Sequence, residues 1–288
     1  MAGTLYLVGT PIGNLGDLSP RAAEVLGSVD FIAAEDTRVT LKLLNHFEIK
    51  KPLLSYYEHN KVESAAVILP RLLAGENCAL VSDAGMPAIS DPGEQLVRLC
   101  AEHQIPVVAV PGPSAVVTAV AMSGLPTQRF TFEGFLSNSG KSRREHLASL
   151  REEHRTMVIY EAPHKLVATL ADLLEALGDR DVALCRELTK LHEEVRRTTL
   201  SQALEHYRRE PPRGEFVLVI RGAPEEKGPR QSLEAAMELL YRLRDEGLSL
   251  KEAARRAAAE TGQSRNDLYH AALVEDRAKE KLPNDEKK

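Results

Sequence analysis

The sequence has no tryptophan and only three cysteines among its 288 residues. The missing tryptophan excludes no function. Cys78, Cys100 and Cys185 stand in apolar runs and lack the spacing of metal ligands. We therefore expect buried, reduced thiols in a cytoplasmic protein rather than a disulfide framework.

A long apolar run is also missing. A membrane-spanning helix needs roughly 18 to 20 apolar residues, and the longest candidate, 107–122, is broken by Pro111-Gly112-Pro113. The N-terminus shows no basic region or cleavage site of a secretion signal. We expect neither membrane insertion nor secretion.

Positive charge is not in excess, because the formal net charge is −5. A nucleic-acid partner would therefore need a local basic surface. The hydrophobic content of 43% and charged content of 27% are typical of a globular protein. A chain of this length has room for two domains and an appendage.

Short apolar runs alternate with helical periodicity, which predicts a mostly parallel sheet with crossover helices. The expected strands are 5–8, 31–34, 78–82, 107–110, 130–132, 157–161, 182–186 and 216–220. The expected helices are 19–26, 39–46, 62–73, 94–103 and 164–177. Charge increases after residues 124–127, so we expect an N-terminal α/β domain over 1–123 and a second α/β domain over 124–223 that closes a cleft.

The rest of the chain predicts a linker and helices. Residues 222–230 have linker composition, and helices are expected over 232–246, from the capping box 249–252 to about 260, and after the cap Ser264. We expect a helix-turn-helix-like unit within 224–277 and a disordered tail over 278–288. Acidic residues of the helix-turn-helix-like unit balance its basic residues. Two roles of this unit therefore remain possible: contact with nucleic acid, and plain packing on the second domain.

Loops rich in small residues and carboxylates follow the strands of the first half. The most informative is 81–93, and the others are 8–17, 33–38 and 110–115. Open α/β sheets bind ligands at such strand ends, where small residues let a ligand approach the backbone. In 8–17 a proline replaces the second glycine of the dinucleotide fingerprint, which disfavours a pyrophosphate site.

Three of these interpretations have alternatives. Asp36 can orient a hydroxyl, act as a base or pair with Arg38, or it can simply cap the following helix. Ser114 can cap the next helix. The titratable clusters 160–165 and 186–194 form either a pocket wall or solvated helix starts.

The segment Gly140-Lys141-Ser142 lacks the spacing and the preceding strand of a nucleotide-binding P-loop. Ser142 and Glu145 instead suggest a capping box. Lys141, Arg143 and Arg144 make the most concentrated basic site, suited to phosphate contact or to a solvated helix start. The histidines show no metal-site spacing, so we expect no metal.

Together these motifs resemble the tetrapyrrole methylase superfamily, and more closely its ribosomal small-subunit RNA methyltransferase I branch. The resemblance rests on LYLVGTPIGNL (5–15), AEDTR (34–38), SDAGMPAISDPG (82–93), PGPSA (111–115) and ELTKLHEE (187–194). The terminal helical unit also resembles that branch. Gly85-Met86-Pro87 stands where the tetrapyrrole enzymes show Gly-Asp-Pro, which argues against a porphyrin-like substrate.

The resemblance implies a two-domain α/β fold, with a parallel sheet in the N-terminal domain, a mixed sheet in the second and a small C-terminal helical unit. It implies a homodimer that uses S-adenosylmethionine to methylate the ribose 2′-oxygen of a cytidine in the decoding region of 16S ribosomal RNA. The expected substrate is this RNA within the assembled small subunit, and naked RNA stays open as the alternative. The expected cofactor-binding residues are Pro11, Asp83, Gly85, Met86, Ile89, Ser114, Ala115, Glu161, Ala162 and Leu184. The expected RNA-binding residues are Arg38, Lys141, Arg143, Arg144, Arg255, Arg256 and Arg265.

Methyl transfer to oxygen is an in-line displacement, so alignment supplies much of the acceleration. A ribose hydroxyl is a poor nucleophile and gains from a base. We expect Asp36 as base or hydroxyl orienter and Lys190 as its electrostatic partner, with Glu35, Arg38 and Glu187 as alternates. Two other interpretations are a methylase of a small tetrapyrrole, with a deep apolar cleft, and a non-catalytic RNA-binding or assembly factor without cofactor affinity.

Overall fold

The computed structural model describes residues 1–138, 140–224 and 231–280. The chain forms two compact units, Met1–Ala223 and Pro224–Lys288. Among the described residues, no helix is both long enough and apolar enough to cross a membrane.

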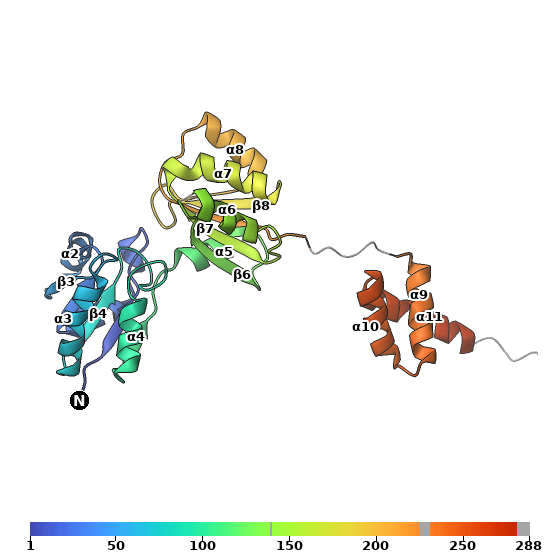
Figure 1. Ribbon diagram of the computed structural model, residues 1–288, viewed down its shortest axis with the longest axis horizontal. Coiled ribbons are helices and arrows are strands. Elements are labelled where there is room, and N and C mark those ends of the chain that lie inside the picture. The colour runs from blue at the N-terminus through green and yellow to red at the C-terminus, as the bar shows by residue number, and fades with distance from the viewer. Residues whose placement is uncertain (139, 225–230, 281–288) are drawn as a thin grey trace, which may run out of the picture. The chain divides into compact units, whose positions relative to one another are not determined.

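The first sheet has five parallel strands in the order β3-β2-β4-β1-β5. Figure 1 labels β3 and β4 of this sheet together with the helices α2, α3 and α4. The strands are β1 (Leu5–Val8), β2 (Phe31–Ala34), β3 (Leu53–Ser55), β4 (Cys78–Val81) and β5 (Val107–Val110). The helices are α1 (Pro20–Ser28), α2 (Thr37–His46), α3 (Lys61–Leu73) and α4 (Glu94–Glu102), with a short 3₁₀ turn, η1 (Leu15–Asp17).

Both faces of this sheet are buried. Phe31 and Leu80 pack with Ile68 of α3 and Leu96 of α4 on one face. On the other face, alternate strand residues pack with α1 and α2. Burial on both faces explains why these strands are continuous apolar runs, and the predicted parallel sheet is confirmed.

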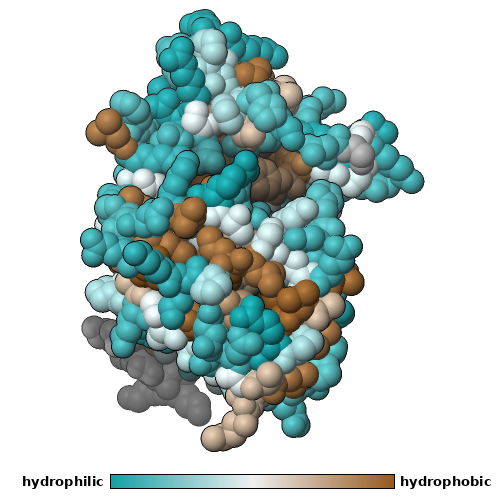
Figure 2. Space-filling model, turned by 90° about the vertical axis from the view of Figure 1, so that its left-hand side faces the viewer, coloured by the Kyte–Doolittle hydropathy of each residue, from teal (hydrophilic) through white to brown (hydrophobic). Residues whose placement is uncertain are grey.

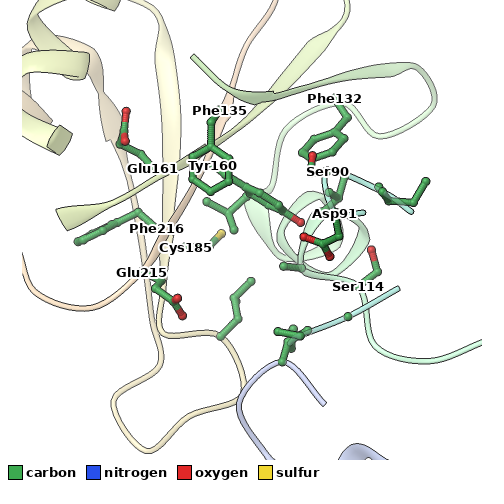
Figure 3. A pocket seen from close by; sticks show the side chains of 18 of the residues that line it. Ser90, Asp91, Ser114, Phe132, Phe135, Tyr160, Glu161, Cys185, Glu215 and Phe216 are labelled. Atoms are coloured by element: carbon green, nitrogen blue, oxygen red, sulfur yellow. The ribbon is translucent and has the colours of Figure 1, made fainter. Parts of the chain in front are cut away.

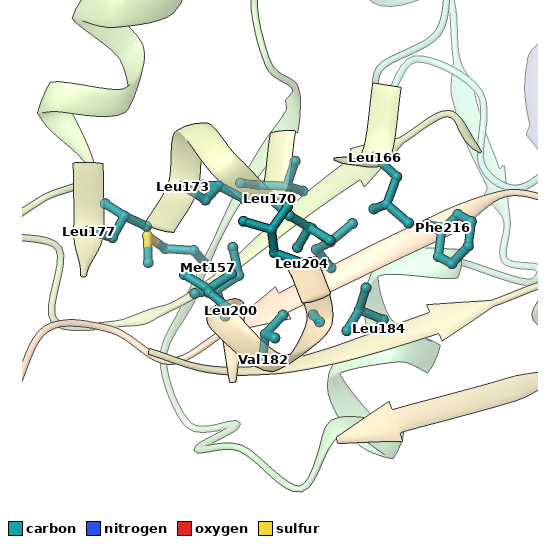
Figure 4. Close-up of a cluster of buried hydrophobic side chains, with 14 of the residues drawn as sticks. Met157, Leu166, Leu170, Leu173, Leu177, Val182, Leu184, Leu200, Leu204 and Phe216 are labelled. Atoms are coloured by element: carbon teal, nitrogen blue, oxygen red, sulfur yellow. The ribbon is translucent and has the colours of Figure 1, made fainter. Parts of the chain in front are cut away.

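The second sheet is mixed, in the order β6-β7-β10-β8-β9, and only β6 and β7 pair in parallel. Its strands are β6 (Phe130–Phe135), β7 (Thr156–Glu161), β8 (Asp181–Arg186), β9 (Glu194–Thr199) and β10 (Phe216–Ile220). Helices α6 (Gly140–Ser149), α7 (Pro163–Leu177) and α8 (Leu200–Arg209) share one hydrophobic core with it. Figure 4 shows leucines of α7 and α8 packed over Met157, Val182 and Leu184.

Helix α5 (Ala115–Ser123) covers the other face of the second sheet. Val116 and Val120 of this helix pack against Val158, Val217 and Val219. We expected the domain junction after residue 123, which would leave α5 with the first sheet. The structure packs α5 on the second sheet, so the change from one sheet to the other comes between β5 and α5. Composition changes later, where the polar strands of the second sheet begin.

Local sequence signals predicted several ends of helices and strands correctly and missed others. Ser19 caps α1 with Pro20 in its first turn, as predicted. The strands β3 and β9 were not expected, since β3 has only three half-buried residues and β9 has a single apolar residue, Val195, among charged residues and threonines. The capping box at Ser142 is wrong, because α6 already begins at Gly140.

The second unit contains α9 (Leu233–Asp245), α10 (Leu250–Thr261) and α11 (Arg265–Glu280) around a shared apolar core. Ser249 caps α10, and Gly262 ends it in the left-handed conformation with φ of 68°. The predicted pair of helices joined by a short glycine turn is thus confirmed. Of the expected linker 222–230, residues 225–230 lie outside the described residues. The expected disordered tail began at residue 278, but α11 continues to Glu280, and the rest of that tail, 281–288, lies outside the described residues.

Candidate active site

A cavity of about 720 Å³ lies between the two sheets of the first unit. One wall comes from loops that follow β1, β2, β4 and β5. The other comes from β6, β7, β8 and β10, from the segments that follow β7 and β8, and from Glu215 just before β10. The face drawn in Figure 2 is hollowed, with apolar residues in and beside the hollow and hydrophilic ones over most of the rest.

The loops of the first wall are joined to one another through their backbones. Thr10 N donates to Gly85 O at 2.9 Å, and Gly85 N donates to Thr10 O at 3.1 Å. A Cβ atom on Gly9 would lie 2.7 Å from the backbone of Gly112, which leaves no room for a side chain. The ends of β1, β4 and β5 therefore hold one another in place.

Unusual backbone conformations gather beside the cavity. Ala88 and Ser90 have φ of 67° and 62°, and Glu187 and Thr189 have φ of 51° and 65°. These are four of the six non-glycine residues with positive φ in the described chain. Such residues are strained and concentrate at functional sites, so the loops 83–93 and 187–190 are candidates for ligand contact.

Three carboxylates of the first wall line the cavity: Glu35, Asp83 and Asp91. Burial raises the pKa of each, and repulsion from neighbouring carboxylates adds to the effect. Asp36 N donates to Asp83 Oδ1 at 3.0 Å and Asp83 N to Glu35 Oε2 at 3.4 Å. The loops after β2 and β4 thus hold a compact acidic group.

Asp36 does not line the cavity. Its carboxylate caps α2 by accepting from Arg38 N at 2.8 Å, and it also pairs with the Arg38 guanidinium. The Arg38 hydrogen bonds hold the pKa of Asp36 well below its usual range. The capping alternative is confirmed, and of the acidic pair only Glu35 faces the cavity.

Aromatic rings dominate the second wall. Phe130, Phe132 and Phe135 come from β6 and Tyr160 from β7. The Tyr160 ring lies edge-on to Phe132 and Phe135, with centroids 5.0 and 5.6 Å apart. Burial raises the pKa of Tyr160 to about 12, and its hydroxyl points toward Asp91 (Figure 3).

Lys190 sits between two carboxylates at the end of β8. Its Nζ lies 2.9 Å from Glu187 Oε1 and 2.8 Å from Glu215 Oε2. Burial opposes the charge of Lys190, but the two hydrogen bonds outweigh it and raise the pKa. A Cβ atom on Gly13 would lie 2.5 Å from Lys190 Cγ, so the first wall contacts the second here.

Most of the expected cofactor residues line the cavity: Asp83, Gly85, Met86, Ile89, Ser114, Ala115, Glu161 and Ala162. Pro11 does not, and the neighbouring Ile12 takes its place. Leu184 does not either, because it points into the core beneath α7 and α8, and Cys185, facing the other way along β8, lines the cavity instead. Ser114 stands at the start of α5 but makes no capping hydrogen bond, so its expected capping role is wrong.

Of the expected catalytic residues, Glu35, Glu187 and Lys190 line the cavity.

The expected RNA-binding cations differ in their freedom to bind RNA. Arg143 is held by Asp172 Oδ2 at 2.7 Å and Thr169 Oγ1 at 2.8 Å, with only 17% of its side chain exposed. Arg143 therefore does not belong to the exposed basic site.

The remaining cations are on the surface. Lys141 has a distant i,i+4 pair with Glu145 at 3.8 Å, and Arg144 is exposed. In the second unit, Arg255 pairs with Glu252, while Arg256 and Arg265 are exposed. Within the described part of the chain, no group of histidines, cysteines or carboxylates could hold a metal ion.

The sequence interpretation missed several lining residues. Phe130 and Phe132 occupy alternate positions of an expected strand, a pattern that could have placed them on one face. Phe135 lay beyond the expected strand end. Ser90 and Asp91 belong to a loop that was named, but their contribution depends on the left-handed turn at Ala88 and Ser90.

Comparisons with known proteins agree with this geometry. The family model of the tetrapyrrole (corrin/porphyrin) methylases matches residues 4–204, and the model described as the RsmI C-terminal HTH domain matches residues 231–277. A "Ribosomal RNA small subunit methyltransferase I" of Synechocystis sp. is 50% identical over 272 residues, covering 94% of this chain and 98% of that protein. Proteins of the same name from Thermotoga maritima and Escherichia coli O157:H7 are 52% and 46% identical, covering 76% and 94% of this chain and 99% and 95% of their own lengths.

Solved structures show the same fold at low identity. A diphthine synthase aligns with a TM-score of 0.59 at 14% identity, covering 76% of this chain and 90% of that one. A uroporphyrin-III C-methyltransferase of Thermus thermophilus, complexed with S-adenyl homocysteine, aligns with a TM-score of 0.54 at 19% identity, covering 76% and 97%.

Proposed function

Since the chain belongs to the tetrapyrrole methylase family, and within it to the ribosomal RNA small subunit methyltransferase I proteins, we propose that it methylates 16S ribosomal RNA with S-adenosylmethionine as donor. The acceptor is the ribose 2′-oxygen of a cytidine in the decoding region. The proposal agrees with the fold and with the identity to the ribosomal methyltransferases, which disfavours both a tetrapyrrole acceptor and a non-catalytic RNA-binding factor.

One observation carries the proposal: a single cavity places a rigid, acidic, glycine-rich wall opposite an aromatic wall. Its volume of about 720 Å³ lies in the range of ligand sites. The residues fit the donor chemically, because Asp83 and Asp91 supply negative charge for a cationic ligand and the closely joined glycine loops expose backbone. When bound, S-adenosylmethionine supplies a methyl group activated by a sulfonium.

The chain's own residues then orient and activate the acceptor. Glu35 accepts the proton of the hydroxyl, because its raised pKa makes it a stronger base than an ordinary glutamate. Asp36, the first expected base, is paired with Arg38 and does not line the cavity. Lys190, fixed by Glu187 and Glu215, stabilises negative charge that develops on the ribose oxygen.

RNA recognition is assigned to cations outside the cavity. Lys141 and Arg144 lie on α6, and Arg256 and Arg265 lie on α10 and α11. Contacts of this kind weaken steeply with salt, so RNA affinity should fall between 50 and roughly 200 mM salt. Equal affinity across that range would contradict the assignment. We further propose that the enzyme is a cytoplasmic homodimer that acts on the assembled small subunit.

The decisive experiment incubates the full chain with labelled S-adenosylmethionine and small subunits that lack the modification. Naked 16S RNA is tested in parallel, and mass mapping of the RNA locates the methyl group. We expect label on one cytidine ribose, with faster transfer to the subunit than to naked RNA. Label on a base, or no label on either form of the RNA, would overturn the proposed function.

A further inference from the structure

Phe135 is the most exposed of the aromatic residues that line the cavity, with 60% of its surface exposed. A large aromatic ring on a strand is normally covered. Phe132 and Tyr160, its neighbours on the same wall, are only partly exposed. Phe135 therefore presents an apolar face to solvent at the outer part of the cavity.

A β-bulge puts the ring there. Phe132 is paired with Val158, Gly134 with Ile159 and Phe135 with Tyr160, so Glu133 is the extra residue of β6. Side chains alternate along a regular strand, and without the bulge Phe135 would lie on the opposite face. The bulge instead gives Phe135 the same face as Tyr160.

Gly134 makes this bulge possible. Its φ of 63° is left-handed, a conformation that glycine adopts without strain. A Cβ atom there would also lie 3.3 Å from Ser90 Oγ on the opposite wall. The bulge therefore positions Phe135 at a place where the two walls come close together.

The extra residue connects the bulge to the helix that carries the exposed cations. The Glu133 carboxylate lies 3.3 Å from His146 Nε2 of α6. Lys141 and Arg144 are exposed on the preceding turns of that helix. On the neighbouring helix, Lys165 donates to Asn138 Oδ1 at 2.8 Å, which places another cation beside the loop after Phe135.

We propose that Phe135 is a stacking platform for an unpaired base of the RNA substrate, with Lys141 and Arg144 contacting the adjoining phosphates. The inference rests on the proposed function and names the residue that seats its substrate. Exposed aromatic rings beside cations are the usual means of holding single-stranded nucleic acid. The exposed position of the ring favours a macromolecule that enters from outside over a small donor enclosed deeper in the cavity.

The test compares the full-length wild type with Phe135→Ala, Phe135→Leu and Phe135→Trp, using small subunits that lack the modification. We expect Phe135→Ala to raise the KM for subunits roughly 10- to 100-fold, with an unchanged dissociation constant for S-adenosylmethionine. Phe135→Trp should restore the KM and Phe135→Leu should not, because leucine keeps the apolar area but has no ring. Val62→Ala, at an exposed position on α3, is the control and should change neither constant.

Three outcomes would overturn the platform. They are a wild-type KM in Phe135→Ala, full rescue by leucine, and a loss of donor affinity equal to the rise in KM. The wild-type reaction separates these outcomes from failure of the proposed function. If the proposed function were wrong, the wild type itself would transfer no methyl group to RNA.

Discussion

The two walls of the cavity are built by different means. In the first sheet all strands are parallel, so their carboxyl ends meet at one edge and the loops there supply carboxylates and backbone. In the second, mixed sheet the wall is made by strand faces as well as strand ends, and it holds the aromatic rings of the cavity together with the Lys190 cluster. The comparison separates a wall suited to a cationic donor from a wall suited to a nucleic-acid acceptor.

The largest expected effect tests the acidic wall. Glu35→Gln should lower kcat by about 100- to 10,000-fold, the usual range for loss of a general base, while donor affinity changes little. In the wild type kcat should rise with pH through a pKa above the ordinary glutamate value of 4.5, because only the deprotonated carboxylate accepts the proton. Single-turnover assays across pH measure both effects.

Asp36→Asn is the matched control for Glu35→Gln. Asparagine can still cap α2, and the Asp36 side chain lies outside the cavity, so kcat should stay within about threefold of wild type. A collapse of kcat in Asp36→Asn with normal activity in Glu35→Gln would return the role of base to Asp36.

The next effect tests the charged part of the second wall. Lys190→Met should lower kcat roughly 10- to 100-fold, less than for an uncompensated cation, because Glu187 and Glu215 already neutralise part of its charge. Lys141→Met, at an exposed cation outside the cavity, should raise the KM for RNA without lowering kcat. The two variants would contradict the division of roles if they changed the same constant.

A smaller effect concerns the rigidity of the first wall. Gly9→Ala forces a methyl group against the Gly112 backbone, and overpacking of this kind destabilises by about 1–3 kcal/mol. Donor affinity should fall with stability, since the wall itself is displaced. Urea denaturation and calorimetric titration measure the two, and Gly27→Ala, where a Cβ meets nothing within 4 Å, is the control.

The smallest effect is the pH dependence of stability. The pKa of Asp91 is raised in the folded protein, so the folded state is favoured below its unfolded pKa and loses that advantage as the pH rises through the folded value. Asp91→Asn should therefore be slightly more stable than wild type at pH 7, with the gain vanishing near pH 4. The gain should be small, because Asp91 is only partly buried and solvent screens its charge. Asp36, with its lowered pKa, should show the opposite sign and lose its contribution as the pH falls.

The first wall was largely predictable from the sequence. Buried parallel strands are continuous apolar runs, and the loops after them are rich in glycine and carboxylate, so the loops containing Gly85 and Ser114 could be placed at one edge. The sequence could not tell which of two adjacent acids faces inward. That depends on the start of α2, where Asp36 turns to cap the helix and Glu35 is left facing the cavity.

The second wall was less predictable, because its features come from pairing between strands. The bulge at Glu133 changes which face Phe135 occupies, and this shift is set by register with β7. Leu184 was expected to contribute its backbone to the cofactor site, and the sequence could not tell that its side chain enters the core while the side chain of Cys185 lines the cavity. Arg143 looked like a free cation because its partner Asp172 is 29 residues away.

The backbone contacts among β1, β4 and β5 also bear on the order of synthesis. Every strand of the first sheet lies before residue 111 and every strand of the second lies after residue 129. Domains generally fold as units, the N-terminal one first, as a chain leaves the ribosome. The Thr10–Gly85 and Gly9–Gly112 contacts can therefore form while the second sheet is still being translated. Helix α5 can pack only after the second sheet, which it covers, has been made.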